Sequence, residues 1–323
     1  MTSDVMQVQA NNADVMGRFM EGLSRAPRPP EKIDPADVRV LRDLAYGTEL
    51  RMDLYLPQSA PTPTPVIVWL AGGGWRNQRR GHGPRLPRLF AERGYAMADI
   101  EYRSSEVSPW PAQLHDVLAA LRHLRDIADT HALDRASIGL WGSSAGAHLA
   151  LLAAFAADTD HSPAAPGVRA VVAGYPPTDL LHLNDDALPG GVLGVDRSDP
   201  AWGLLGGRPS DRAATAVEAS PARQVHPRVP PVLLLHGDAD LLVGPAQSRR
   251  LHDALLTAGA ESHLLLVHGA HHGFLNTGDW ELHPMTATAL SSRAPDAERS
   301  VLLTPALIER FFDRHLRTDP WHA

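Results

Sequence analysis

The sequence contains no cysteine, which excludes disulfide bonds, thiolate nucleophiles and cysteine-ligated zinc. It has no run of basic residues and carries a formal net charge of -7, so nucleic acid and anionic membranes are disfavoured as partners. No stretch approaches the roughly 20 apolar residues that a membrane span needs. The first ten residues lack the basic start and apolar core of a signal peptide. These absences predict a soluble cytoplasmic protein.

The 323 residues, 44% hydrophobic and 21% charged, have the composition of an ordinary globular protein. Apolar strand-like runs alternate with helix-like runs along most of the chain. The expected strands are residues 65–70, 95–102, 136–141, 168–175, 232–236 and 263–268. The expected helices are residues 86–93, 112–131, 144–157 and 245–258. Near-continuous apolar strands separated by helices predict a largely parallel sheet that is covered on both faces.

A hairpin and a final helix flank this alternation, and three other segments do not fit it. Residues 38–46 and 49–56 predict an antiparallel hairpin, and residues 305–316 predict a final helix. Residues 12–30 have an apolar helical face that breaks at prolines, which indicates either a separate docking helix or a frayed end. Residues 176–229 and 275–303 have little periodicity, so they are expected to be irregular. Long irregular loops in a compact domain are typical of functional lids or disordered segments.

The expected fold class is therefore α/β, with a mostly parallel central sheet, helices on both faces and a loop-rich lid. Residues 1–37 would form an N-terminal segment with a possible cap helix. Residues 38–323 would form one domain with insertions at about 177–226 and 275–303. In open sheets of this type, ligands bind at the carboxyl ends of the strands. The residues that directly follow the predicted strands are therefore the candidates for chemistry.

The most informative of these positions is the run Gly142-Ser143-Ser144-Ala145-Gly146. It places Gly-x-Ser-x-Gly between a strand-like run and a helix-like run, where a serine sits in a strained turn with its hydroxyl exposed. Glycine at both ends lets the neighbouring backbones pass close to each other. The following helix points its positive N-terminal end toward any negative charge that develops there. The pattern indicates that Ser144 is a nucleophile rather than part of a small-residue turn.

A nucleophilic serine needs a base, and the base needs an orienting acid. The strand at 232–236 is followed by Asp238 and Asp240, and the strand at 263–268 is followed by His271 and His272. Serine, then acid, then histidine is the chain order of an α/β-hydrolase triad. Chain position alone leaves open which carboxylate and which histidine serve, and a turn that caps a helix would also place carboxylates here.

Backbone donors for an oxyanion are expected in the segment Gly72-Gly73-Gly74-Trp75, which follows the strand at 65–70. Glycines let the amides turn toward a bound carbonyl, and the amide after the nucleophile, that of Ala145, would be the other contributor. A phosphate-binding loop is the rival explanation. It fails because the segment has neither G-x-G-x-x-G nor the G-K-[ST] ending of a P-loop.

Several short motifs in a specific order extend this pattern from about Leu54 to Leu316. They are Asp53-Leu54-Tyr55-Leu56-Pro57, Gly72-Gly73-Gly74-Trp75, Glu101-Tyr102-Arg103, Pro111-Ala112-Gln113-Leu114-His115-Asp116, Gly142-Ser143-Ser144-Ala145-Gly146, Leu204-Leu205-Gly206-Gly207, Ala219-Ser220-Pro221, His236-Gly237-Asp238-Ala239-Asp240 and His272-Gly273-Phe274. The chain resembles the α/β-hydrolase esterases, in the branch akin to hormone-sensitive lipase and bacterial feruloyl-type carboxylesterases.

The resemblance implies that Ser144 is the nucleophile, Asp240 the acid and His272 the base. It also implies an oxyanion hole formed by the amides of Gly73, Gly74 and Ala145, with no cofactor and no metal. In one respect the chain departs from the family. The family usually has histidine before the three glycines, and this chain has Ala71. The donors are backbone amides, so the hole can survive, but a side chain that normally braces the loop is missing.

The expected reaction is hydrolysis of a small carboxylic ester through an acyl-serine. The same triad would also serve amidase, arylformamidase, lactone or carbamate chemistry. A metallohydrolase is the rival from another class, because His263, His268, His271 and His272 cluster with Asp238 and Asp240. Those histidines do not match H-E-x-x-H on a helix. A non-catalytic receptor on the same fold is a further alternative, although it would be expected to lack a triad member.

Other notable residues have simpler interpretations. His148 lies one helical turn after Ser144 and is expected to pack in a buried helix. His236 is expected to make structural hydrogen bonds at a strand end, and Asp116 to cap a helix or pair with a cation. Trp75 and Trp110 could wall the site, although large aromatic residues are more often core.

Overall fold

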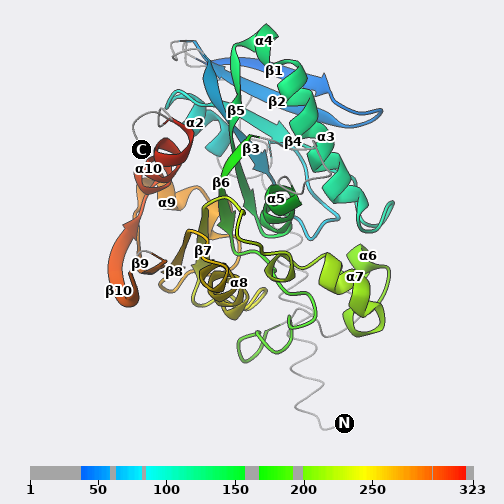
Figure 1. Cartoon of the computed structure of the whole chain (residues 1–323), viewed down its shortest axis with the longest axis vertical. Coiled ribbons are helices and arrows are strands. Elements are labelled where there is room, and N and C mark those ends of the chain that lie inside the picture. The colour runs from blue at the N-terminus through cyan, green and yellow to red at the C-terminus, as the bar shows by residue number, and fades with distance from the viewer. Residues whose placement is uncertain are drawn as a thin grey trace.

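The computed structural model of the chain describes residues 38–58, 63–81, 85–156, 167–191, 199–292 and 294–317. Ten strands form one sheet in the order β1-β2-β4-β3-β5-β6-β7-β8-β9-β10 (Figure 1). They are β1 Val38–Ala45, β2 Arg51–Pro57, β3 Thr64–Leu70, β4 Ala96–Ile100, β5 Leu133–Ser143, β6 Val168–Gly174, β7 Val232–Gly237, β8 Ser262–Val267, β9 Met285–Ser291 and β10 Ala294–Leu303. The predicted helical face in residues 12–30 lies outside the described residues.

The centre of the sheet is parallel and its two edges are antiparallel. Strands β4, β3, β5, β6, β7 and β8 run parallel to one another. Strands β1 and β2 form the expected opening hairpin, which joins β4 antiparallel. The expectation of a largely parallel sheet with an antiparallel hairpin at its start is confirmed.

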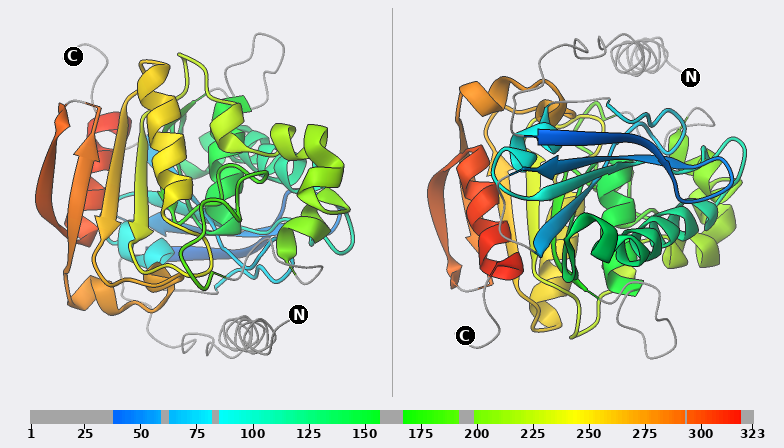
Figure 2. Two further views of the ribbon diagram at one scale, coloured as in Figure 1. Left: turned by 90° about the horizontal axis from the view of Figure 1, so that it is seen from below. Right: turned by 90° about the horizontal axis from the view of Figure 1, so that it is seen from above.

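The helices cover both faces of the sheet. They are α2 Leu86–Ala91, α3 Ala112–Asp126, α4 Ala128–His131, α5 Ala145–Ala156, α6 Pro200–Leu205, α7 Ala213–Glu218, α8 Ala246–Thr257, α9 Asp279–Leu282 and α10 Pro305–Leu316. Helices α3, α5 and α8 contribute to one buried cluster, and α2 and α10 to the other, on the opposite face (Figure 2). Along β3, Val68 faces the first cluster, whereas the adjacent Ile67 and Trp69 face the second. This alternation explains the near-continuous apolar sequence of the central strands.

The prediction that residues 275–303 form an irregular insertion was wrong for most of that segment. Strand β9 pairs antiparallel with β8, and β10 pairs antiparallel with β9, so the two extend the sheet at its far edge. Only Ala287 of β9 is buried, and the strand consists mainly of threonine, alanine and serine. A strand that is mostly half-exposed needs no apolar run, so the hydrophobic signal that marks the central strands is weak in β9.

Two further segments differ from the prediction. The helix expected over 112–131 is divided at Ile127 into α3 and α4. Residues 176–229 contain helices α6 and α7 and the short turns Pro209–Arg212 and Pro221–Arg223. Among the described residues, no helix is long and apolar enough to cross a membrane.

Candidate active site

Ser144 lies in the turn between β5 and α5, at the carboxyl edge of the sheet. Its φ of 51° is in the left-handed region, where a residue other than glycine is strained. Its amide donates to the carbonyl of Gly174 on β6 at 2.8 Å. A Cβ on Gly142 would lie 2.5 Å from the carbonyl carbon of Gly146, and one on Gly146 would lie 2.1 Å from the Leu70 carbonyl oxygen. The two glycines therefore allow the close approach that this strained turn requires.

The structure brings Ser144, His272 and Asp240 into one chain of hydrogen bonds. The Ser144 Oγ lies 2.9 Å from Nε2 of His272, and Nδ1 of His272 lies 2.7 Å from Oδ2 of Asp240. A carboxylate only accepts hydrogen bonds, so Nδ1 carries the proton and Nε2 is free to accept from the serine. The three residues follow β5, β8 and β7, whose carboxyl ends meet at one edge of the sheet.

Asp240 is completely buried and is stabilised as a carboxylate. Its Oδ1 accepts the amides of Leu242 at 2.9 Å and Val243 at 3.0 Å. Its Oδ2 lies 3.3 Å from Nε2 of His236. Burial raises the pKa of Asp240, but the charge of His272 and the hydrogen bonds from both histidines outweigh burial and hold that pKa below its usual value. Asp240 is therefore ionised at neutral pH, as an orienting acid must be.

The neighbouring candidates Asp238 and His271 point elsewhere. Asp238 is exposed, and its Oδ1 accepts the amide of Gly269 at 2.7 Å. His271 is also exposed, and its Nδ1 donates to the carbonyl of Ala239 at 2.9 Å. The geometry thus joins Ser144 with Asp240 and His272, the same pair that the family resemblance implies.

The histidines that raised the metallohydrolase alternative do not converge. His263 lies between Ser291 and Glu261, at 2.8 and 3.0 Å. His268 lies 2.8 Å from the hydroxyl of Thr288 on β9. Within the parts of the chain that the structure describes, no group of three or more histidine, cysteine or acidic side chains is arranged to hold a metal ion.

The loop after β3 passes beside Ser144, because a Cβ on Gly72 would lie 3.2 Å from the Cβ of Ser144. Gly73 and Gly74 have φ values of 131° and 60°, which favour glycine. Over the described ranges no residue accepts a hydrogen bond from either of these two amides. Ala145 is the first residue of α5, and the first amides of a helix have no partner within the helix. These three amides are the ones expected to bind an oxyanion.

Other contacts brace this loop in the absence of a histidine at position 71. The Tyr102 hydroxyl donates to the Ala71 carbonyl at 2.7 Å. The amide of Gly72 donates to the Ser143 hydroxyl at 3.1 Å, so the serine next to Ser144 has a structural contact of its own. The indole N–H of Trp75 donates to Nδ1 of His148 at 3.2 Å. The loop is therefore attached to β5, to α5 and to the segment that follows β4.

Tyr175 is a site residue that the sequence reasoning missed. It follows β6 with a φ of 41°, and its ring lies edge-on to that of His272, with centroids 4.6 Å apart. Tyr175 is fully buried and also contacts the ring of Phe274, at 5.3 Å. Its position directly after a central parallel strand is the signal that could have identified it.

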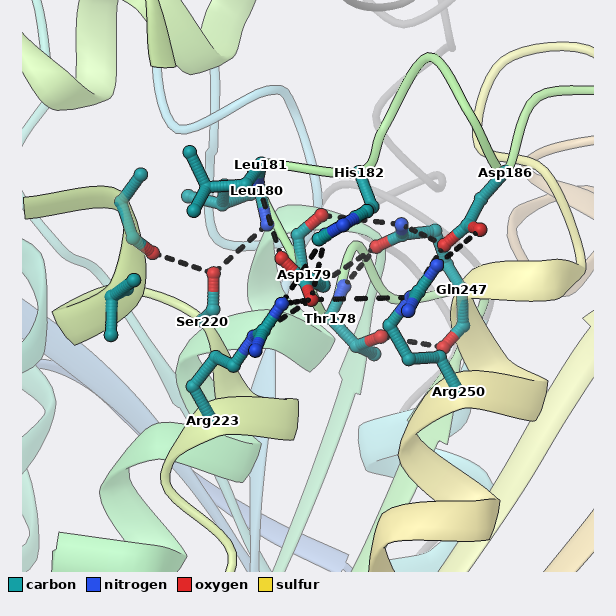
Figure 3. Close-up of polar contacts among 12 residues, drawn as sticks. Thr178, Asp179, Leu180, Leu181, His182, Asp186, Ser220, Arg223, Gln247 and Arg250 are labelled. Atoms are coloured by element: carbon teal, nitrogen blue, oxygen red, sulfur yellow. Dashed lines mark hydrogen bonds and ion pairs between the residues drawn. The ribbon is translucent and has the colours of Figure 1, made fainter. Parts of the chain in front are cut away.

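The segment after Tyr175 is fixed by a polar network around Asp179 (Figure 3). The Asp179 carboxylate accepts from Nε of Arg223 at 2.9 Å and lies 3.1 Å from Nδ1 of His182. Gln247 of α8 accepts the amide of Asp179 at 2.8 Å through Oε1 and donates to Asp186 at 2.6 Å. Arg250 pairs with Asp186 through two nitrogen atoms, at 2.9 and 2.7 Å. The network ties the loop after β6 to α8, which follows the Asp240 loop.

Comparison with known proteins agrees with this architecture. Residues 52–255, more than half of the chain, match the model of the BD-FAE family. Esterase LipQ of Mycobacterium tuberculosis is 32% identical over 253 residues, which cover 72% of this chain and 56% of LipQ. The probable isoprenylcysteine alpha-carbonyl methylesterase ICME of Oryza sativa subsp. japonica is 27% identical, over 72% of this chain and 58% of its own length. The chain thus spans little more than half the length of these relatives.

Two solved structures have similar folds. The truncated form of a carbohydrate esterase from gut microbiota has a TM-score of 0.64 and 27% identity, covering 75% of this chain and 91% of its own. Esterase B of Lactobacillus rhamnosis, in a structure with an inhibitor, has a TM-score of 0.67 and 21% identity over 97% of this chain and 96% of its own. The chain therefore has the α/β-hydrolase fold and belongs to the BD-FAE family.

Proposed function

We propose that this chain is a serine hydrolase that cleaves carboxylic esters of small molecules. The observation that carries the proposal is the Ser144–His272–Asp240 chain of hydrogen bonds, at 2.9 and 2.7 Å, on a strained strand-to-helix turn. The esterase names of the relatives support ester hydrolysis over the other carbonyl chemistries that such a triad could serve.

The proposed reaction follows from the roles of the three side chains. His272 Nε2 takes the hydroxyl proton of Ser144 as Oγ forms a bond to the ester carbonyl carbon. The C–O bond to the alcohol then breaks, and His272 returns the proton to the leaving oxygen. In the second half, His272 takes a proton from water, the water oxygen attacks the acyl carbon, and Ser144 leaves with the proton. Asp240 holds the imidazole in the required tautomer throughout.

The negative charge that develops on the carbonyl oxygen needs preorganised donors. The amides of Gly73, Gly74 and Ala145 are proposed for this role, and the N-terminal end of α5 adds a favourable dipole. Replacing Gly73 by proline removes one donor and fixes φ near -65°, far from the observed 131°. A loss of at least about 10²–10³-fold in turnover is expected, and full activity in Gly73→Pro would exclude this loop from the reaction.

Active-site labelling tests the nucleophile directly. A fluorophosphonate should form an adduct in the intact protein, and peptide mapping should place it on Ser144. Ser144→Ala should abolish the adduct. Ser143→Ala is the matched control, because this neighbouring hydroxyl is buried against Gly72 and should not be the labelled group. An ester-hydrolysing protein labelled at another serine would overturn the assignment.

A panel of substrates can determine which acyl and alcohol groups the protein prefers. p-Nitrophenyl esters of increasing acyl length should be compared with acetylated sugars and with aryl amides. We expect hydrolysis of esters to exceed that of the matched amides. Faster cleavage of amides would favour the amidase or arylformamidase alternative on the same residues.

A cytoplasmic location and a lack of affinity for nucleic acid stay predictions from the sequence. Fractionation of cells that express the protein tests the location. A binding assay with duplex DNA at low salt tests the second prediction, which follows from the net charge of -7.

A further inference from the structure

We propose that His148 is a positioning residue that holds the Gly72–Trp75 loop against the helix that carries Ser144. The proposal rests on the function proposed above. His148 lies one turn after Ser144 on α5, and its amide donates to the Ser144 carbonyl at 3.0 Å. The side chain is fully buried. The structure thus assigns more to this residue than the space-filling role that its sequence position predicts.

Both ring nitrogens of His148 are engaged, which fixes the tautomer of the imidazole. The Trp75 indole N–H can only donate, so Nδ1 accepts, at 3.2 Å. The Ala219 carbonyl can only accept, so Nε2 carries the proton and donates, at 2.6 Å. A second proton on Nδ1 would break the contact with Trp75. Burial lowers the pKa of His148 to about 4, so the ring is neutral over the usual range of assay pH.

The Trp75 end of this bridge controls the loop with the candidate oxyanion donors. Trp75 follows Gly74 directly and has a φ of 58°. Its ring is buried edge-on to His148, with centroids 5.1 Å apart. A side chain fixed at this point limits how far the amides of Gly73 and Gly74 can move relative to Ser144. The bridge provides a brace that Ala71 cannot provide.

The Ala219 end is itself anchored. Ala219 follows α7, and the next residue, Ser220, accepts the amide of Leu180 at 2.9 Å. Arg223, at the end of the following turn, pairs with the buried Asp179 (Figure 3). The bridge therefore connects the nucleophile helix, the glycine loop and the Asp179 network. His148 therefore has a fixed hydrogen-bond partner at each ring nitrogen, as a positioning residue requires.

The test compares variants that remove the bridge from either side. His148→Phe keeps a ring of similar size, and Trp75→Phe removes the indole N–H together with part of the ring. Each variant should lower kcat by about 10- to 10²-fold with little change in KM. A misplaced donor reduces stabilisation of the transition state more than it reduces binding of the substrate. The double variant should lose little more kcat than His148→Phe alone, because both substitutions remove the Trp75–His148 hydrogen bond. His148→Gln retains a donor and an acceptor and should recover part of kcat.

His252→Phe is the matched control. His252 is a buried histidine on α8 whose Nδ1 lies 2.7 Å from the Ser262 hydroxyl, remote in the fold from the glycine loop. It should lower the melting temperature and leave kcat unchanged. The proposal is overturned if the His148 and Trp75 variants fold and match this control in kcat, or if their effects are additive. If the wild type neither hydrolyses esters nor reacts with the phosphonate, the proposed function fails first, which is a distinct result.

Discussion

Two buried carboxylates, Asp240 and Asp99, have pKa values shifted in opposite directions. The Asp240 carboxylate contacts two backbone amides and two histidines, which stabilise its charged form despite its burial. Asp99 on β4 accepts one amide, that of Gly81, at 2.7 Å, and within the described residues its Oδ1 has no hydrogen-bond partner. Burial raises the pKa of Asp99 to about 7, with the Gly81 hydrogen bond opposing and the charge of Asp53 adding to the rise. The number of local donors decides the direction in which the pKa of each carboxylate shifts.

Asp240→Asn and His272→Ala should each reduce turnover of an activated ester by about 10⁴-fold, as expected when a triad loses its tautomer control or its base. Asp238→Asn and His271→Ala are the matched controls, since both side chains are exposed and directed to backbone groups. The Asp240/His272 double variant should be far from additive, because triad members act as a unit. A larger loss in Asp238→Asn than in Asp240→Asn would contradict the assignment.

Asp99→Asn should change how stability depends on pH. The pKa of Asp99 is about 7 when folded and about 3.9 when unfolded. The group is therefore protonated in both states below about pH 4, and wild-type stability falls as pH rises toward 7 because only the unfolded state ionises. Asn lacks this titration and can still accept the Gly81 amide. The free energy of unfolding of the variant should rise relative to wild type between pH 4 and pH 8, which denaturant titrations at both pH values would measure. A constant difference would contradict a raised pKa.

Among the elements, the central strands and the helices beside the site were predictable, and the far edge of the sheet was not. Strands β3, β5 and β7 are buried on both faces, so an apolar run identifies each of them. Helix α10 begins and ends at the predicted residues. Strand β9 is half exposed, so its sequence alternates weakly and gave no such signal. The choice between Asp238 and Asp240 could not be made from spacing either. Both residues follow β7, and only the turn of the backbone directs Asp240 inward.

Helix α10 should be fixed mainly by Phe312. This residue is fully buried and lies 6.2 and 6.3 Å from the rings of Trp141 and Phe90. Phe312→Ala should lower the free energy of unfolding by about 3–5 kcal/mol, with no direct effect on the Ser144–His272 contact. Leu302→Ala on β10 is the control, because that side chain is 53% exposed and should change stability by less than about 0.5 kcal/mol. Chemical denaturation measures both variants. Equal effects would show that α10 is not held through this cluster.

Across the whole molecule, the candidate active site is assembled from residues 72 to 272 at one edge of the sheet. The segment with α6 and α7 docks directly on the glycine loop. Arg76 donates to the Asp199 carbonyl at 3.2 Å, and a Cβ on Gly74 would lie 2.9 Å from Pro200. The amide of Trp110 donates to the Leu204 carbonyl at 2.8 Å. We therefore propose this segment as the part of the predicted insertion at about 177–226 that influences substrate choice in the proposed reaction.

The proposed division of the chain into residues 1–37 and an α/β-hydrolase domain over 38–323 predicts the outcome of a deletion. The family match begins at residue 52, and the first strand of the sheet begins at Val38. A variant that starts at residue 38 should therefore fold and react with a small phosphonate at Ser144. The apolar helical pattern in residues 12–30 predicts that this segment is buried, either over the site or on the far side of the fold. Cover over the site predicts that the deletion changes the ratio of rates on long and short acyl esters. Melting temperature, labelling and the two rates are measured together. A folded, labelled variant with an unchanged ratio would exclude the segment from substrate selection, whereas loss of folding would contradict the domain boundary itself.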